Sequence, residues 1–246
     1  MESPSQLPSG DSAAEDEASE SLVSKVMNDI RSMIRSEGLK IGDSLPSESA
    51  MGEKLGVSRA VVREAYRSMA ALQLINVGNG RRAKVSAVDR GVLALVIDHG
   101  VQTDQVSIQQ ILDVRRTIEM RTVSLAALRR TDREAREIKA HAAAMRADFF
   151  DADKVMEHDI AFHECIAKAS RNPMFALIVG SFHVVTRQTW RIGWGARETD
   201  ADRYENVACH EAIAAAIEEQ NRAQAESLMA AHFDNTVKML LASGIN

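Results

Sequence analysis

Residues 46–85 read PSESAMGEKLGVSRAVVREAYRSMAALQLINVGNGRRAKV. This segment predicts two short helices, joined by a tight turn and followed by a β-hairpin. The first helix is expected over 48–55, and Gly56-Val57 supplies the turn. Ser58 is a good N-cap for the second helix, because its hydroxyl can accept a hydrogen bond from a free N–H of the first helical turn.

The second helix has two different faces. Apolar side chains repeat at i, i+3, i+4 spacing and form one stripe for burial, which consists of Val62, Ala65, Tyr66, Met69 and Leu72. Arg59, Arg63 and Arg67 recur every four residues on another face. Arginines on the free face of a helix after a tight turn suit the major groove, where they bind guanine edges or phosphates. The alternative is a solvated basic face on a structural helix.

The segment after this helix predicts a β-hairpin. Strand-like runs at 74–77 and 83–85 flank Gly78-Asn79-Gly80, which is a strong hairpin signal. Arg81 and Arg82 follow the hairpin tip, where their side chains would reach a phosphate or a minor groove. The hairpin and the two helices together predict a winged helix-turn-helix.

The pattern LPSE…GVSRAVVREA, followed by a glycine- and arginine-rich wing, resembles the DNA-binding domain of GntR-type bacterial transcription regulators. The resemblance implies that Arg59 and Arg63 contact the operator and that Gly80 enters the minor groove. Ser49 departs from the arginine that usually follows PSE in the family, and the wing GNGRRAKV departs from the commoner GRGTFV, so the operator sequence is not transferable. The DNA-binding candidates are Ser58, Arg59, Arg63, Arg67, Gly80, Arg81 and Arg82.

Composition limits the class of protein. The chain has a net charge of −5, whereas residues 50–90 hold eight Lys/Arg against three Asp/Glu, so the basic charge is local. Two cysteines without paired spacing favour a reducing compartment. No apolar run approaches the roughly 20 residues that span a bilayer. We expect a protein of the bacterial cytoplasm that associates with the nucleoid when it is bound to DNA and has no membrane partner.

The 246 residues allow two domains. Residues 1–20 hold six acids and no Lys or Arg, which predicts a disordered acidic tail. The winged domain is expected over 21–85 and a linker over 86–90. Helical patterns follow one another over 91–246. The predicted fold is therefore mainly α: a winged helix-turn-helix with a small β-hairpin wing, then an all-α bundle of six or seven helices.

Four residues of the bundle form a candidate metal site. Asp159 and His163 lie one turn apart on a predicted helix, and His210 and His232 lie on the apolar stripes of the last two. Three buried histidines and a buried carboxylate without partners would be costly, and a shared divalent cation would remove that cost. The alternative is four separate, hydrogen-bonded core residues.

The fragment DIAFH…ASRNP, followed by His210 and by His232, resembles the FCD effector domain of the FadR branch of the GntR regulators. The resemblance implies that Asp159, His163, His210 and His232 bind a divalent metal ion, with zinc first and nickel or manganese as alternatives. The segment LDVRRTIE matches the first effector-domain helix of the family, in which Arg115 would contact a ligand carboxylate. A salt bridge to Glu119, four residues later, is the alternative role of Arg115.

These features together predict a homodimeric transcription repressor of a catabolic operon, which a small carboxylate such as a sugar acid or a hydroxy acid releases from double-stranded operator DNA. A regulator that senses the metal itself is an alternative. A metalloenzyme with an accessory DNA-binding domain is a weaker one, because the sequence offers no general base at a fixed spacing. We therefore do not expect an enzyme.

Overall fold

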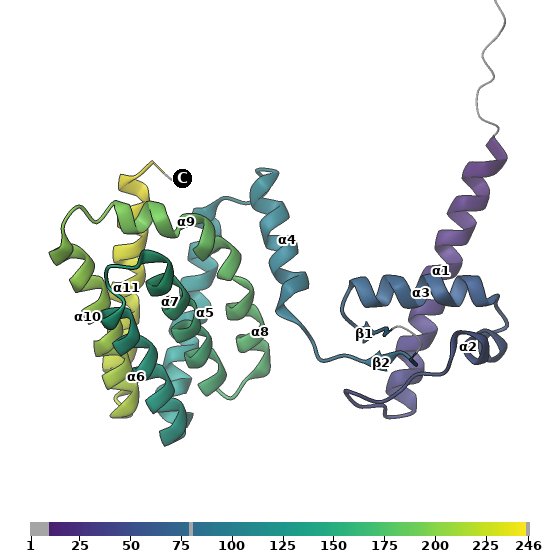
Figure 1. Cartoon of the computed structure of the whole chain (residues 1–246), viewed down its shortest axis with the longest axis horizontal. Helices are drawn as coiled ribbons and strands as arrows, with labels where there is room; N and C mark the ends of the chain where they lie inside the picture. Colours follow the sequence, from purple (N-terminus) through teal and green to yellow (C-terminus); the bar gives the residue numbers. More distant parts are fainter. Residues whose placement is uncertain (1–9, 79–80, 245–246) are drawn as a thin grey trace, which may run out of the picture. The chain divides into compact units, whose positions relative to one another are not determined.

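The computed structural model describes residues 10–78 and 81–244. In these residues the protein consists of eleven α-helices and one two-stranded antiparallel sheet (Figure 1). The chain divides into two compact units between Asp89 and Arg90. The prediction of a mainly α protein, with a winged helix-turn-helix ahead of a helical bundle, is confirmed.

The N-terminal unit contains α1 (Gly10–Ser36), α2 (Glu48–Leu55), α3 (Arg59–Ala71), β1 (Ile75–Asn76) and β2 (Lys84–Val85). Each helix of the helix-turn-helix begins at a serine: the hydroxyls of Ser47 and Ser58 accept hydrogen bonds from backbone N–H groups of α2 and α3, both at 3.3 Å. Gly56 ends α2 in the left-handed conformation with a φ of 68°, which glycine adopts without strain. The strands are shorter than predicted, and Ser44 adds an isolated bridge to Lys84.

The core of this unit lies between α1 and α3. The apolar stripe of α3 contributes Val62, Ala65, Tyr66 and Met69 and packs with Val26, Ile30, Leu45, Met51 and Ile75. Leu72 was predicted to join this stripe, but α3 ends at Ala71 and Leu72 is 47% exposed in the turn that follows. The buried stripe holds α3 against α1 and leaves its arginine face free.

The acidic N-terminal segment differs from its prediction. Disorder was predicted over 1–20, whereas α1 begins at Gly10 and runs without a break to Ser36. Residues 10–20 are rich in alanine and glutamate, which are strong helix formers, so this segment extends the predicted helix backwards. Residues 1–9 lie outside the described part of the chain.

The C-terminal unit contains α4 (Arg90–Gln102), α5 (Ile108–Arg129), α6 (Asp132–Ala147), α7 (Ala152–Ala169), α8 (Pro173–Ser181), α9 (His183–Gly195), α10 (Asp200–Glu218) and α11 (Arg222–Ala242). The described residues thus form eight helices here, where six or seven were expected. One expected helix over 174–191 is divided at Phe182. Next to this break, Ser181 and His183 hydrogen-bond through their side chains to backbone carbonyls of α8, which competes with helical pairing.

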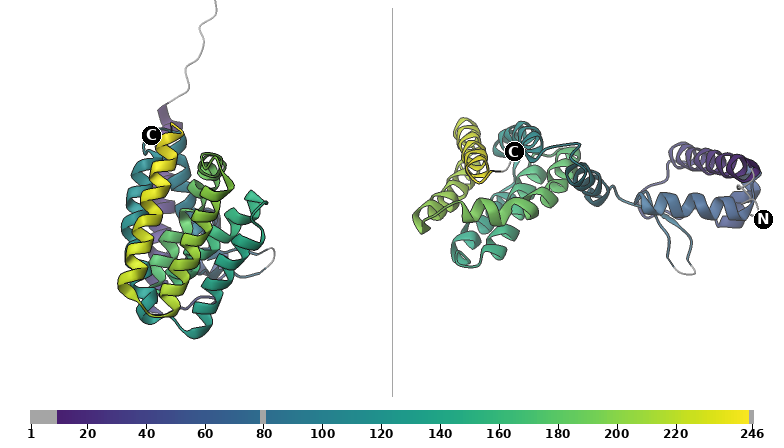
Figure 2. Two further views of the ribbon diagram at one scale, coloured as in Figure 1. Left: turned by 90° about the vertical axis from the view of Figure 1, so that its left-hand side faces the viewer. Right: turned by 90° about the horizontal axis from the view of Figure 1, so that it is seen from above.

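The bundle packs its long helices around one core. α5 lies along α11, α7 lies against α5 and α6, and α10 lies against α6 and α11 (Figure 2). The largest fully buried side chains come from these helices: Phe162, Ile166, Ile213, Ile217, Phe233, Ile138 and Met145. Side chains on the inner faces of α5, α7, α10 and α11 therefore meet inside the bundle. Within the described residues, no helix is both long and apolar enough to span a membrane.

Candidate functional site

The structure brings together all four predicted metal-site residues. Asp159 and His163 lie on α7, His210 on α10 and His232 on α11, with exposed fractions of 5%, 2%, 1% and 8%. Each histidine offers a ring nitrogen, and these nitrogens lie within 4.8 Å of one another. Asp159 Oδ1 lies 2.9 Å from His210 Nε2 and 3.9 Å from His163 Nε2. Four side chains from three helices thus converge on one buried point.

Outer hydrogen bonds orient two of the rings. His210 Nδ1 lies 2.8 Å from the backbone carbonyl of Asn206, and His163 Nδ1 contacts a carboxylate oxygen of Glu119. Both rings therefore direct Nε2 towards the convergence point. His163 Nε2 is buried and has no hydrogen-bond partner in the described residues. A carboxylate or carbonyl behind a ligating histidine is the arrangement that fixes its tautomer in metal sites, so the donor set fits a divalent cation.

The protonation states also suit a metal. Burial lowers the pKa of His232, and the nearby His210 and His163 lower it further, so this imidazole is neutral. Burial alone would raise the pKa of Asp159, but the hydrogen bond from His210 and the neighbouring histidines hold it below its usual value. A neutral imidazole and an ionised carboxylate are the forms that bind metal ions, so His232 and Asp159 carry the protonation states of metal ligands.

Arg115 forms the salt bridge to Glu119 that was the alternative to its predicted contact with a ligand carboxylate. Its Nε donates to Glu119 Oε1 at 2.6 Å, which is the intrahelical salt bridge, and its Nη1 donates to Thr186 Oγ1 at 2.8 Å. The guanidinium also lies over the ring of Phe233, 5.6 Å from its centre. Glu119 is fully buried and bridges Arg115 to His163. The sequence spacing indicated the contact of Arg115 with Glu119 but not its contact with Thr186.

A cavity of about 60 Å³, partly open to solvent, borders this cluster. Asp159 and His232 line it from the metal-site side, and Arg115 lines it from α5. Thr189 and Trp190 of α9 also line this cavity. A ligand in this cavity would therefore reach the candidate metal site and the Arg115 region at once.

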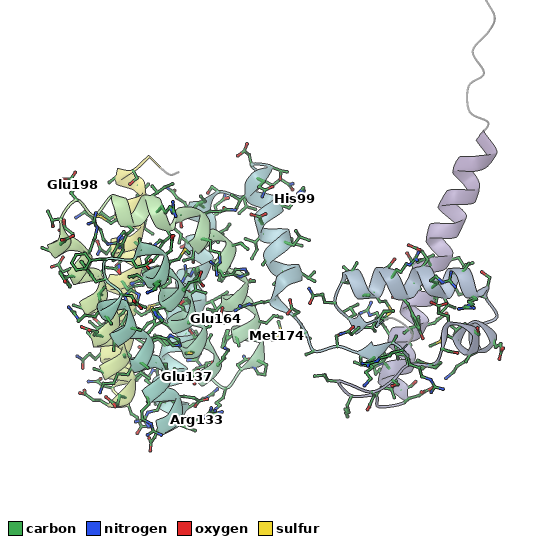
Figure 3. The ribbon with its side chains drawn as sticks, in the orientation of Figure 1. His99, Arg133, Glu137, Glu164, Met174 and Glu198 are labelled. Atoms are coloured by element: carbon green, nitrogen blue, oxygen red, sulfur yellow. The ribbon has the colours of Figure 1, made fainter. Side chains whose placement is uncertain are left out.

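Sequence reasoning missed one charged residue of the cavity, Arg197. It follows α9 in the short connection to α10, next to the exposed Glu198 (Figure 3), and is itself buried. In the sequence it is one arginine within a charged run, and no periodicity extends through that run. Only the preceding Gly-Trp-Gly distinguishes it from its neighbours.

The DNA-binding candidates lie on α3 and the wing. Arg59 and Arg63 are exposed, and the Nε of each donates to the same carboxylate oxygen of Glu48, at 3.0 and 3.2 Å. Arg67 is exposed beside Glu64, at 3.8 Å. A groove between the helix-turn-helix and the wing is lined by Arg59, Glu48, Arg81 and Arg82.

Two other candidates differ from these arginines. The hydroxyl of Ser58 is engaged as the N-cap of α3, so Ser58 positions the helix. Gly80 lies outside the residues that the structure describes.

A second group of possible ligands lies between α6 and α7. Glu137, His141 and Cys165 offer atoms within 4.8 Å of one another, and His141 Nδ1 lies 3.4 Å from His158 Nδ1. The thiol of Cys165 donates to Glu137 at 3.5 Å, and burial raises the pKa of this thiol to about 12. In the described residues, every buried ligand atom of this group has a hydrogen-bond partner, whereas Nε2 of His163 has none.

Comparison with known proteins agrees with both domains. Residues 22–85 match the model of the gntR family of bacterial regulatory proteins, and residues 110–235 match that of the FCD domain. The chain is 31% identical over 213 residues to the HTH-type transcriptional regulator LutR of Bacillus subtilis, which covers 85% of this chain and 96% of LutR. It is 27% identical over 191 residues to the galactonate operon transcriptional repressor of Escherichia coli, covering 75% and 82% of the two chains. The solved structure of a Streptococcus agalactiae GntR protein shares the fold, with a TM-score of 0.64 and 23% identity over 88% of this chain and 99% of that one.

Proposed function

Because the chain belongs to the GntR family of bacterial regulatory proteins and carries an FCD domain, we propose that a small carboxylate controls its DNA binding through the site on α7, α10 and α11. The protein is a ligand-responsive, DNA-binding transcription regulator and not an enzyme. The observation that carries the proposal is the cavity beside the histidine cluster, which Asp159, His232 and Arg115 line together. One relative is named for the operon of galactonate, a sugar acid, which supports an acid of this class.

In this proposal Asp159, His163, His210 and His232 hold a divalent ion, and zinc is preferred because imidazole and carboxylate are among its common ligands. When bound, the ion supplies Lewis-acid positions for oxygen atoms of a ligand. The residues of the chain orient that ligand: Asp159 and His232 border the cavity on the metal side, and Arg115 borders it from α5. Thr186 and Glu119 hold the Arg115 guanidinium in place.

We propose that the protein acts as a homodimeric repressor of a catabolic operon in the cytoplasm. Two winged domains would then bind the half-sites of a pseudo-palindrome. The acid releases DNA only if it binds one arrangement of the two winged domains better than the other. Residues 86–90, which connect the units, would transmit that difference.

Operator release is the direct test of this function. The full-length protein, loaded with zinc, is bound to labelled DNA from the promoter of its own operon, and hydroxy acids and sugar acids are titrated while fluorescence anisotropy is followed. We expect at least one acid to lower the DNA affinity of the loaded protein and to have no effect after chelation. If zinc alone changes the affinity and no acid does, the protein is a metal sensor. If an acid raises the affinity, the protein is not a repressor of the proposed kind.

A second prediction concerns Arg63 on the exposed face of α3. The change Arg63→Ala is expected to weaken operator binding by about 1–3 kcal/mol, because a bidentate contact to a guanine would be lost. Arg133→Ala is the matched control, since Arg133 is an exposed arginine of α6 in the other unit (Figure 3). Anisotropy titration with operator and with scrambled DNA measures both. An unchanged preference for the operator would rule out base reading by Arg63.

A further inference from the structure

Arg197 is a buried cation that forms no direct ion pair within the described residues. Its exposed fraction is 6%, and it lines the cavity that Asp159 and His232 border. Its Nη1 donates to the backbone carbonyl of Gly193 at 2.6 Å. Its Nε is buried without a hydrogen-bond partner, and within residues 10–78 and 81–244 no carboxylate forms an ion pair with it.

The groups around Arg197 stabilise only part of its positive charge. The carbonyl of Gly193 belongs to the last turn of α9, where the helix dipole favours a cation. Asp202 is the next acid along the chain, but its side chain is exposed and accepts hydrogen bonds from Thr199. Burial lowers the pKa of Arg197, and the nearby charges of Asp159 and Asp202 offset only part of this shift, yet an arginine stays charged in proteins. A buried guanidinium that is charged and lacks an ion pair is stabilised when an anion binds it.

Arg115, on the same cavity, is the internal comparison. Its guanidinium is paired with Glu119 and held by Thr186, so its charge is already balanced. Among the four charged side chains of the site, Asp159 and Glu119 balance Arg115 and Arg197. A divalent ion at the histidines would then leave the site with an excess of two positive charges. A monocarboxylate neutralises only one of them.

We propose that the effector carries two anionic groups and is a dianion in this sense: one carboxylate binds on the metal side of the cavity and a second anionic group binds Arg197. This inference rests on the proposed function and narrows its ligand class. The second group is a carboxylate or a phosphate, since the guanidinium fork binds the oxygen atoms of either in the same way. Arg197 is thus a specificity-determining residue that selects diacids over monoacids of the same length.

Matched pairs of acids test this selection by calorimetric titration of the full-length, zinc-loaded protein. The pairs are malate with 2-hydroxybutyrate, galactarate with galactonate, and 3-phosphoglycerate with glycerate. In at least one pair, the dianion is expected to bind about 10-fold or more tightly than the monoanion. If the preference appears in the malate or galactarate pair, the second group is a carboxylate. If it appears in the 3-phosphoglycerate pair, the second group is a phosphate.

The variant Arg197→Gln is expected to lower the affinity for that dianion by about 30-fold or more and to leave the monoanion unchanged. Arg197→Lys, which keeps the charge, should retain part of the preference. Arg191→Gln is the control, because Arg191 is an exposed arginine of α9 that pairs with Asp153. Zinc content and thermal midpoint show that each variant is folded.

The outcomes separate the two proposals. If a monoanion and its dianion bind equally and Arg197→Gln changes neither, the proposed function stands and the dianion inference is wrong. If no acid of any pair binds the loaded protein, both are wrong.

Discussion

Replacing His163 with alanine is expected to abolish stoichiometric metal binding. Its Nε2 is buried without a hydrogen-bond partner in the described residues, and Glu119 orients its ring through a contact with Nδ1. Outer-shell partners of ligating histidines alone contribute about 10–100-fold to metal affinity, so the loss of the ligand itself should exceed about 100-fold. Wild-type protein purified without chelator and then supplied with zinc should hold about one ion per chain, and the variant none, as measured by mass spectrometry of the metal content.

His141→Ala is the matched control for this experiment. His141 belongs to the second group of possible ligands, in which the thiol of Cys165 is already hydrogen-bonded to Glu137. The control should keep its zinc. Zinc retained in His163→Ala and lost in His141→Ala would place the ion between α6 and α7 instead. Wild-type protein that takes up no zinc, nickel or manganese would remove the metal from the mechanism.

Replacing Glu119 with alanine is expected to lower the free energy of unfolding of the bundle by about 3–5 kcal/mol. Glu119 is fully buried, and it accepts from Arg115 while it contacts His163. Burial alone would raise the pKa of Glu119, but its contacts with His163 and Arg115 hold it below its usual value, so it is a carboxylate at neutral pH. Alanine would leave a cavity and a buried guanidinium without its counter-ion.

The measurement is urea unfolding followed by tryptophan fluorescence, since Trp190 and Trp194 both lie in the C-terminal unit and report on it alone. Glu198→Ala is the control, because Glu198 is exposed in the connection between α9 and α10 (Figure 3). Glu119→Gln should destabilise less than alanine, since it keeps the shape and one acceptor. Equal midpoints for wild type and Glu119→Ala would contradict the role of Glu119 as the central counter-ion.

The sequence predicted the parts of the site that follow helical periodicity. His163, His210 and His232 are polar residues on apolar stripes, and burial of a stripe carries its polar members inwards with it. Their positions in the chain differ widely, yet the packing of amphipathic helices leaves few ways for such stripes to meet. Asp159 joined this set through its spacing of one helical turn from His163, and the resemblance to the FCD effector domain then supported all four residues.

The remaining features depend on contacts between segments. Arg197 is buried in the connection from α9 to α10, where it lines the cavity, and no repeat in the sequence encodes the path of that connection. The contact from Glu119 to His163 joins α5 to α7, whereas sequence spacing indicates only pairs within one helix. The early start of α1 has a different origin: its acidic composition suggested disorder, while the helix propensity of its alanines and glutamates favoured a helix.

The shared contact of Arg59 and Arg63 with Glu48 affects how the protein searches a genome. In the free protein this carboxylate is an internal competitor for both guanidiniums, in the place that a DNA phosphate would take. When these arginines exchange Glu48 for a DNA phosphate, fewer condensed counterions are released from the DNA than when two unpaired arginines bind it. Sliding along arbitrary sequence is therefore weakened, while a correct base that forms two hydrogen bonds with an arginine still displaces Glu48. If Arg59 and Arg63 bind DNA as proposed, Glu48 would thereby increase the ratio of operator to bulk-DNA occupancy without touching a base.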